Sequence, residues 1–295
     1  MSRGLPYNAS TPRLTVCAIL ALLSKKEFIM PFDGSVGYSR HTPEKQQHFR
    51  EICKTYARVC KGVFKKNWAH PIMQYFDLNA GSGYVNNRPG SPIIFGEEAC
   101  KANVEFNASL FEENHDAFVR LSNSVLTFNE WNGVFNEFNM QAYFGDHYSR
   151  LPEVVLKHYC KQSKPAFGFM YSDENGVIPP FDLISSMMDV PCFKTLDVVL
   201  YLSATTIKRV RRAFPQHEEN NLECYLRSIG KKHIIVREPA GRHQWTFAIC
   251  TNWGEFPEFK TQHFHHIETP EGREIFRRLN LTAKELDDDP SERDA

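Results

Sequence analysis

The stretch from residue 74 to residue 84 constrains the fold of this chain more than any other. It reads QYFDLNAGSGY, a short apolar segment that reaches Asp77 and then breaks into Ala80 to Gly83. This pattern predicts a buried strand that turns sharply at its carboxyl end, where a nucleotide-like ligand can approach bare backbone. A glycine pair of this kind is also typical of an ordinary tight turn, so the prediction depends on the segments that come after the turn.

The segments after the glycine turn extend the pattern. Gly90-Ser91-Pro92 predicts a helix start, because it supplies a cap followed by proline at the first helical position. An apolar run from residue 106 to residue 111 then ends at Glu112, which predicts a second strand closed by an acid. An acid at that position can accept hydrogen bonds from both hydroxyls of a ribose. The series of strand, glycine turn, helix, strand and acid is typical of half of a Rossmann-like fold.

Composition sets the scale of the fold. With 295 residues, 42% of them hydrophobic, the chain can bury a full core and is expected to form one large α/β domain with appendages. Basic and acidic residues number 35 each, so bulk charge does not indicate nucleic acid. The eight cysteines contain no C-x-x-C pair, which favours reduced thiols in a cytosolic protein, and no metal site is predicted.

The chain is expected to divide into three parts. Residues 1–40 form an N-terminal extension expected to be partly disordered, residues 41–285 a Rossmann-like domain with an N-terminal helix, and residues 286–295 an acidic tail. The apolar run from Leu14 to Leu23 is too short to span a bilayer and lacks a cleavage site typical of signal peptides. It favours an N-terminal helix, or an extension upstream of a start at Met30, and no membrane association is expected.

A helix should begin at Thr42-Pro43 and carry two stripes. The apolar stripe consists of Phe49, Ile52, Tyr56, Val59 and Val63, and the basic stripe of Arg50, Lys54, Arg58, Lys61 and Lys65. The apolar spacing of three and four predicts a face turned to the core. The basic stripe is open to two interpretations, a solvated helix face or a surface that follows a phosphate backbone.

Two further strands are expected to end in acidic turns. The segment from residue 141 to residue 147 ends in Gly145-Asp146, where a carboxylate can accept the exocyclic amine of adenine or can simply cap a turn or helix. The apolar segment from residue 166 to residue 171 is followed by Asp173 and Asn175. Because Rossmann-like enzymes react at the carboxyl edge of the central strands, Asp173 is expected to contact substrate.

A fifth strand is predicted from Leu196 to Leu202, and it leads into a cluster of cations. The cluster consists of Lys208, Arg209, Arg211 and Arg212. It lies at a strand-to-helix transition, so it can contact an anionic polymer or form a solvated helix face. The segments 233–238 and 244–251 are then expected to form an antiparallel pair.

Taken in order, these elements resemble the class I S-adenosylmethionine-dependent methyltransferases, and more specifically the three-Cys-motif partner protein family of bacteria and phages. The residues that carry the resemblance are Phe76 to Gly83, Gly90-Ser91-Pro92, Phe111-Glu112, Gly145-Asp146, Asp173 with Asn175-Gly176, and Ser203-Ala204-Thr205 with Lys208-Arg209. They span roughly residues 68 to 255. The sequence departs from the family pattern at Asn79, where phenylalanine is usual, and at Glu174, where proline is usual.

The resemblance implies an α/β fold of the Rossmann-like methyltransferase type, a mostly parallel sheet of about seven strands with one antiparallel strand near an edge and helices on both faces. It implies S-adenosylmethionine as cofactor and a cytoplasmic location. The implied cofactor-binding residues are Asp77, Asn79, Ala80, Gly81, Ser82, Gly83, Glu112 and Asp146. Within this set the 81–83 turn would lie under the methionine moiety, Glu112 would hold the ribose and Asp146 would sit by the adenine. Asp173 and Asn175 are the implied catalytic residues.

The sequence favours one function and leaves a second open. The favoured function is methyl transfer to nucleic acid by a protein of phage or mobile-element type. Such transfer needs alignment of the methyl group with its acceptor rather than a catalytic triad. The alternative is a non-catalytic protein that keeps the fold and binds a partner protein or nucleic acid. A nicotinamide-dependent oxidoreductase is disfavoured, because the loop lacks the third glycine of Gly-x-Gly-x-x-Gly.

Overall fold

The central element of the fold is a mixed β-sheet. A computed structural model of the chain describes residues 42–67, 72–85, 87–131, 140–159, 165–174, 178–204, 207, 222–239, 245–254 and 257–280. Its large sheet contains β1 (Met73–Asp77), β4 (Phe106–Glu112), β5 (Met140–Phe144), β6 (Phe167–Ser172), β7 (Leu196–Ser203), β8 (His233–Arg237), β9 (Trp245–Thr251) and β10 (Phe264–His266). The short β2 (Tyr84–Val85) and β3 (Arg88–Pro89) pair with each other beside it.

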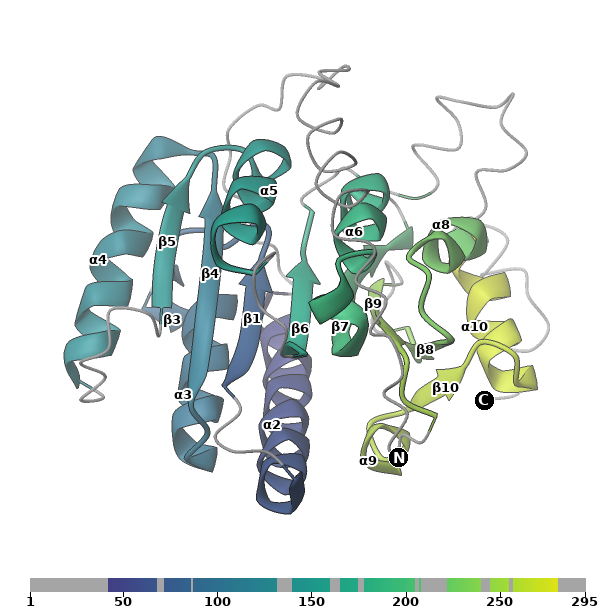
Figure 1. The fold of residues 1–295 in the computed structure, drawn as a ribbon. Helices are drawn as coiled ribbons and strands as arrows, with labels where there is room; N and C mark the ends of the chain where they lie inside the picture. The colour runs from purple at the N-terminus through teal and green to yellow at the C-terminus, as the bar shows by residue number, and fades with distance from the viewer. Residues whose placement is uncertain are drawn as a thin grey trace, which may run out of the picture.

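The order across this sheet is β10-β8-β9-β7-β6-β1-β4-β5 (Figure 1). The five strands from β7 to β5 are mutually parallel. β9 is antiparallel to both of its neighbours, β7 and β8, as the sequence predicted for the 233–251 region. β10 is antiparallel to β8 and forms the edge.

The predicted α/β class, with a mostly parallel sheet and helices on both of its faces, is confirmed. The sheet has eight strands rather than about seven. The additional strand is β10, a segment of three residues with the sequence Phe-His-His. So short and polar a segment has no apolar alternation to reveal it in the sequence, and it is a strand because it pairs with β8.

Helices cover both faces of the sheet (Figure 1). The first layer consists of α2 (Thr42–Asn67), α3 (Ser91–Ala102) and α4 (His115–Trp131). The second consists of α5 (His147–His158), α6 (Phe181–Met188), α8 (Leu222–Ser228) and α10 (Pro270–Asn280). A separate apolar core lies between the sheet and each layer. No helix among the described residues combines the length and the apolar character needed to cross a membrane.

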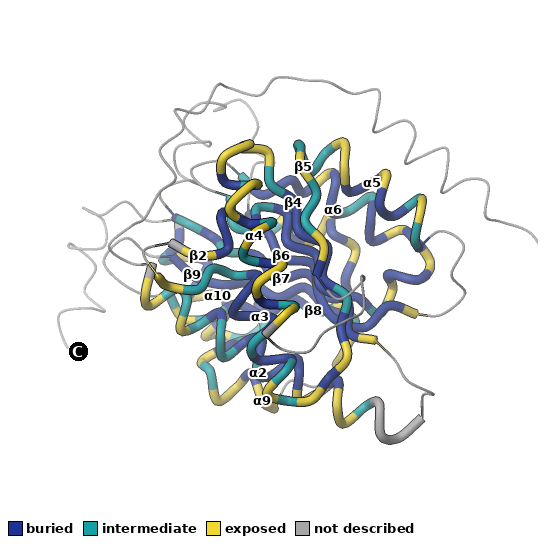
Figure 2. Tube along the Cα trace, turned by 90° about the vertical axis from the view of Figure 1, so that its left-hand side faces the viewer, coloured by how far each residue is buried: buried dark blue, intermediate teal, exposed yellow. Residues whose placement is uncertain are grey.

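Figure 2 shows the central strands β6 and β7 largely in the dark blue of buried residues. The strand β1 lies in the middle of the sheet, and every residue of it is buried. Its neighbours are β4 and β6, both parallel to it. The chain approaches β1 most closely at Gly168 of β6, where φ is +129° and a Cβ atom would lie 1.9 Å from the Gln74 carbonyl oxygen. Only glycine fits there. Because β1 and β6 are parallel and in register from Met73 with Phe167 to Asp77 with Tyr171, their carboxyl ends meet at one edge of the sheet.

Of the two stripes predicted on α2, the apolar stripe is mostly buried and the basic stripe forms contacts within the protein. Phe49, Ile52 and Tyr56 are buried as predicted, whereas Val59 is 40% exposed. In the basic stripe, the Arg50 guanidinium donates to Glu97 and Glu98 of α3 at 2.6 and 2.7 Å, and Lys61 donates to the Ala102 carbonyl. Lys54 pairs with Glu51 on the same helix. These three cations are therefore engaged by α2 and α3, which favours the interpretation of a structural helix face over one that follows phosphates.

Candidate active site

Asp77, at the end of β1, lies beneath the glycine turn. Its carboxylate accepts hydrogen bonds from the hydroxyls of Tyr75 and Ser91, both at 2.6 Å, and from the backbone N–H of Asn79 at 3.2 Å. Complete burial raises the pKa of this carboxyl group to about 6, although these donors act in the opposite direction. The sequence assigned Asp77 to cofactor binding. That assignment stays a prediction; in the structure, Asp77 holds the loop to the start of α3.

The start of α3 corrects one detail of the sequence analysis. Ser91 and Pro92 were expected to supply a cap followed by proline at the first helical position, but the N-cap residue is Gly90 and no side chain caps the helix. The Ser91 hydroxyl donates to Asp77 instead. A charge-assisted hydrogen bond to a buried carboxylate is stronger than a neutral bond to a backbone group, which explains the change of partner.

The two glycines of the turn have different surroundings. Gly81 has φ of +65°, and a Cβ atom built on it would meet nothing within 4 Å. Gly83 has φ of +78°, and its Cβ atom would lie 2.7 Å from the Ser124 Cβ atom of α4. Between them Ser82 is buried, and its hydroxyl donates to the Tyr84 carbonyl. Gly83 therefore packs the turn onto α4, whereas the backbone at Gly81 faces open space.

Glu112, at the end of β4, is joined directly to this turn. One carboxylate oxygen accepts the Gly81 N–H at 2.9 Å and the other accepts the Asn114 N–H at 2.8 Å. Ala80 is held to the same strand, because its N–H donates to the Phe111 carbonyl. Burial raises the pKa of Glu112. Each carboxylate oxygen has a second lone pair, so Glu112 can accept further hydrogen bonds from a ligand at the turn.

Asp146 follows β5 and caps α5. Its carboxylate accepts the Tyr148 N–H at 3.0 Å, which is the helix cap that the sequence left open as one of two interpretations. The contact with adenine stays a prediction. The next residue, His147, is a site residue that the sequence analysis missed, although its position directly after Asp146 was a usable signal.

Asp173 follows β6 and is held by α2. The Lys45 ammonium donates to one oxygen of the carboxylate at 2.7 Å and lies 4.6 Å from the centre of the Tyr201 ring. The other oxygen, Oδ1, is buried and makes no hydrogen bond of regular geometry with a described residue, although the nearby Tyr171 hydroxyl interacts with this carboxyl group. Sequence reasoning found Asp173 but had no local signal for Lys45, since the helix and the strand are distant in the chain.

Glu174 turns to the opposite face of the sheet and connects two segments of the site. Its Oε2 atom accepts the side-chain amide of Asn79 at 3.0 Å, and its Oε1 atom lies 3.8 Å from His147 Nε2. Burial, followed by the charge of Asp173, raises the pKa of Glu174 to about 8. Burial lowers the pKa of His147, so the ring is neutral at pH 7. Glu174 and Asn79 are the two positions at which the sequence departs from the family pattern, and in the structure they bind each other.

Three buried polar atoms at this edge have no hydrogen-bond partner among the described residues. They are Asn79 Oδ1, His147 Nε2 and Asp173 Oδ1, and they come from the segments after β1, β5 and β6. A buried acceptor without a partner costs about 1–3 kcal/mol, so such atoms are normally satisfied by a ligand or by water. Asn79 and His147 both contact Glu174, whereas Asp173 is held by Lys45 of α2. These atoms therefore indicate polar binding positions on both faces of the sheet at its carboxyl edge.

Some predicted site residues lie outside the described residues. They are Asn175 and the cation cluster Lys208, Arg209, Arg211 and Arg212. Within the described ranges, no group of three or more His, Cys, Asp and Glu side chains is arranged to hold a metal ion.

Neither a protein-family model nor a curated protein matches the chain. Solved structures that align with this chain include TYW2 of M. jannaschii in complex with AdoMet, with 12% identity, a TM-score of 0.39 and coverage of 74% of this chain and 77% of that one. The METTL16 MTase domain has 9% identity, a TM-score of 0.42 and coverage of 82% and 81%. An arsenic(III) S-adenosylmethionine methyltransferase from Chlamydomonas reinhardtii has 14% identity, a TM-score of 0.39 and coverage of 66% and 72%.

Proposed function

We propose that the protein is an S-adenosylmethionine-dependent methyltransferase whose cofactor binds at the carboxyl edge of β1, β4 and β5. The observation that carries the proposal is the pair of unpartnered polar atoms Asn79 Oδ1 and His147 Nε2, which follow β1 and β5 at the edge where Glu112 accepts the Gly81 N–H. The ordered series of strand-end residues in the sequence also supports membership of the three-Cys-motif partner family. The unpartnered polar atoms and these strand-end residues lie at the same edge of the sheet.

The residues present fit this cofactor. Asn79 Oδ1 is a buried hydrogen-bond acceptor without a partner among the described residues, and the ammonium group of the methionine moiety can donate to it. Glu112 has lone pairs left for ribose hydroxyls, and Asp146 lies after β5 on the side assigned to adenine. When bound, the cofactor supplies an electrophilic methyl group on a sulfonium sulfur.

The acceptor side of the site is formed by Asp173. With Oδ2 held by Lys45, Oδ1 can accept a hydrogen bond from the N–H or O–H group of the acceptor and thereby orient its lone pair. Glu174 connects this side to the cofactor loop through Asn79. The side chains of this chain therefore bind and orient, and no covalent intermediate with the protein is required.

We further propose that the acceptor is a nucleic acid and that the protein acts in the cytoplasm as part of a phage or mobile element. The support for a nucleic-acid acceptor is the cluster of Lys208, Arg209, Arg211 and Arg212, which follows β7 in the sequence. The location and the phage or mobile-element type are proposed from the sequence resemblance. The alternative, a partner or binding protein that keeps the fold without catalysis, predicts cofactor or partner binding with no methyl transfer.

Calorimetry with S-adenosylmethionine tests the cofactor site. We expect saturable binding to the wild-type protein and at least tenfold weaker binding to Glu112→Gln. Glu113→Gln is the matched control, because this neighbouring carboxyl group is exposed. Absence of heat and of a thermal shift at millimolar cofactor would remove the proposal.

Transfer of a labelled methyl group to DNA, RNA or protein from a cell extract tests catalysis. Asp173→Ala should lose transfer while it keeps cofactor affinity, because Asp173 is assigned to the acceptor. Label on protein alone would exclude a nucleic-acid acceptor. Cofactor binding with no transfer to any of the three would favour the non-catalytic alternative.

Alanine at the four positions 208, 209, 211 and 212 tests the nucleic-acid contact. The variant should bind every nucleic-acid sequence more weakly and with a smaller dependence on salt, because fewer counterions are released. Its affinity for S-adenosylmethionine should be unchanged. An unchanged salt slope in a folded variant would show that the cluster is a solvated surface.

A further inference from the structure

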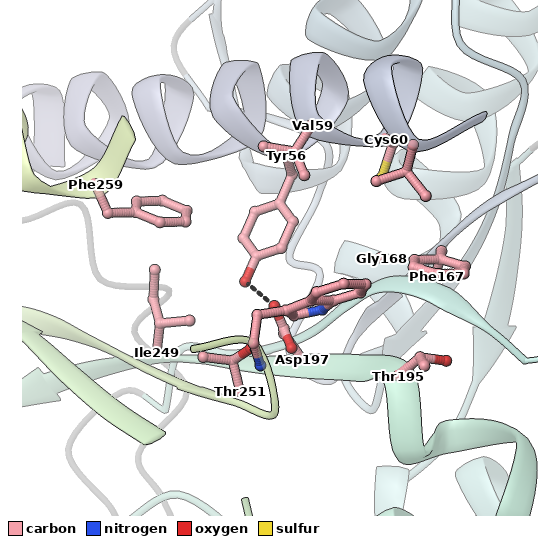
Figure 3. A pocket seen from close by; sticks show the side chains of 12 residues that line it. Tyr56, Val59, Cys60, Phe167, Gly168, Thr195, Asp197, Ile249, Thr251 and Phe259 are labelled. Carbon is pink, nitrogen blue, oxygen red and sulfur yellow. Dashed lines mark hydrogen bonds between the residues drawn. The ribbon is translucent and has the colours of Figure 1, made fainter. Parts of the chain in front are cut away.

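A second cavity lies at the opposite edge of the sheet. Its volume is about 70 Å³, and it is enclosed by the second half of α2, the first residues of β6 and β7, the end of β9 and the short helix α9 (Pro257–Lys260) (Figure 3). The residues assigned to the cofactor follow the other ends of β1, β4 and β5. The cavity is therefore separate from the candidate active site.

The cavity combines apolar walls with one buried carboxylate. Val59, Phe167, Ile249 and Phe259 contribute apolar surface. Asp197 belongs to the lining and is only 6% exposed. The Tyr56 hydroxyl donates to Asp197 Oδ2 at 2.8 Å, as Figure 3 shows. The other oxygen, Oδ1, makes no hydrogen bond of regular geometry with a described residue, although the Thr251 hydroxyl is near enough to the carboxyl group to lower its pKa.

No cation among the described residues forms an ion pair with Asp197. The Lys231 ammonium attracts Asp197 electrostatically, but its hydrogen bonds go to the carbonyls of Phe193 and Lys194, at 3.0 and 3.3 Å. Burial raises the pKa of Asp197 to about 7, although the hydroxyls of Thr251 and Tyr56 and the charge of Lys231 act in the opposite direction. The cavity therefore has an acceptor and a negative charge that the protein compensates only in part.

We propose that this cavity binds the terminal aminoalkyl group of a primary amine. The ammonium would donate to Asp197 Oδ1, and the methylene groups would pack against Val59, Ile249 and Phe259. A carboxylate accepts but does not donate hydrogen bonds, so it selects a donor, and its partly compensated charge selects a cation over a neutral alcohol. The share of one water molecule in the liquid is about 30 Å³, so the cavity holds a group of only a few non-hydrogen atoms.

The proposal does not depend on methyl transfer, and n-propylamine is the probe. We expect saturable shifts of the Ile249 and Thr251 amide signals in nuclear magnetic resonance spectra on titration with n-propylamine. Propionate should give none, because its carboxylate is repelled by Asp197, and 1-propanol should bind at least fivefold more weakly. Equal affinity for 1-propanol or propionate would overturn the proposal, as would a crystal structure at saturating n-propylamine with only water in the cavity.

The pH dependence of this binding identifies the group responsible. Affinity should increase about tenfold from pH 6 to pH 8, because Asp197 must release its proton and its pKa is about 7. The other titratable groups that face it are Tyr56 and Cys60 of α2, Cys250 of β9 and Lys231. Burial raises the pKa of the tyrosine and of both cysteines well above this range, so they stay neutral. Burial lowers the pKa of Lys231, and loss of its charge would act in the same direction.

Two variants complete the test. Asp197→Asn should weaken n-propylamine binding at least tenfold at pH 8 and abolish its pH dependence. If that variant does not fold, Val59→Trp decides, because Val59 is 40% exposed on α2 and a larger side chain there would fill the cavity without disturbing the core. Val119→Trp on α4 is the matched control at an equally exposed valine, 44% exposed. Unchanged binding to Val59→Trp would overturn the proposal.

Discussion

The Lys45 ammonium donates a hydrogen bond to the Asp173 carboxylate at 2.7 Å, across a sequence separation of 128 residues. This contact joins the beginning of α2 to the carboxyl end of β6. It holds one carboxylate oxygen and leaves the other available to a ligand. The N-terminal helix is therefore part of the wall of the candidate site as well as a cover for the sheet.

Lys45→Met should lower the free energy of unfolding by about 1–2 kcal/mol, because it removes a charge-assisted hydrogen bond to a carboxylate. The side chains of Lys45 and Asp173 are only 19% and 16% exposed, so solvent screens the pair weakly. Lys54→Met, which breaks the more exposed pair with Glu51, should cost about 0.5 kcal/mol or less. Urea denaturation measures both. Equal losses would show that the Lys45 pair behaves as an ordinary surface pair.

The stability of the protein should decrease as the pH rises from 7 to 8. The folded protein keeps a proton on Glu174 up to a pKa of about 8, whereas the unfolded chain releases it near the ordinary value of 4.5, so the folded state binds more protons throughout this window. The loss between pH 7 and pH 8 should be about 1 kcal/mol. Asp77 and Asp197, with pKa values of about 6 and 7, contribute mainly at lower pH.

Glu174→Gln identifies the source of this slope. Chemical denaturation at pH 7 and pH 8 should show a flatter dependence in Glu174→Gln, and Glu113→Gln should behave like the wild type because its side chain is exposed. A slope that persists in Glu174→Gln would mean that another group binds the proton.

Gly83→Ala should destabilise the protein by about 2–4 kcal/mol, because alanine is strained at φ of +78° and its methyl group would meet Ser124. Gly81→Ala should lose only about 1–2 kcal/mol, since nothing lies within 4 Å of the added methyl group. The same methyl group would obstruct the open face of the turn, so Gly81→Ala should bind S-adenosylmethionine more weakly in calorimetry.

The double variant Gly83→Ala with Ser124→Gly separates strain from collision. Removal of the Ser124 Cβ atom should restore about 1 kcal/mol or more relative to the sum of the single variants. Strict additivity of the two changes would show that backbone strain alone accounts for the loss.

Gly168→Ala should prevent stable folding, or lower the free energy of unfolding by more than about 4 kcal/mol, because a methyl group 1.9 Å from the Gln74 oxygen would separate β6 from β1. Gly62→Ala is the matched control in α2, where nothing lies within 4 Å of the added atom. It should stabilise the protein by about 0.5–1 kcal/mol, as expected for alanine in place of glycine in a helix. Circular dichroism during thermal unfolding measures both.

The features that the sequence alone determined are those with a local cause. Apolar runs ending at Asp77, Glu112 and Asp173 predicted strands β1, β4 and β6, since burial on both faces of a parallel sheet requires such runs. The alternation of these strands with helices predicted the α/β class before any contact was known. The glycine turn could also be predicted locally, because glycine adopts a positive φ without steric cost, as Gly81 and Gly83 do in the structure.

The tertiary structure alone decided which partner each polar side chain has. Ser91 donates to Asp77, Lys45 to Asp173 and Asn79 to Glu174, and none of these partners could be read from spacing along the chain. The unpaired oxygens of Asp173 and Asp197 are likewise properties of three-dimensional packing. Hydrogen bonds act over about 3 Å, whereas sequence patterns report only periodic burial, so contacts between distant segments appear only when the sheet brings their ends together.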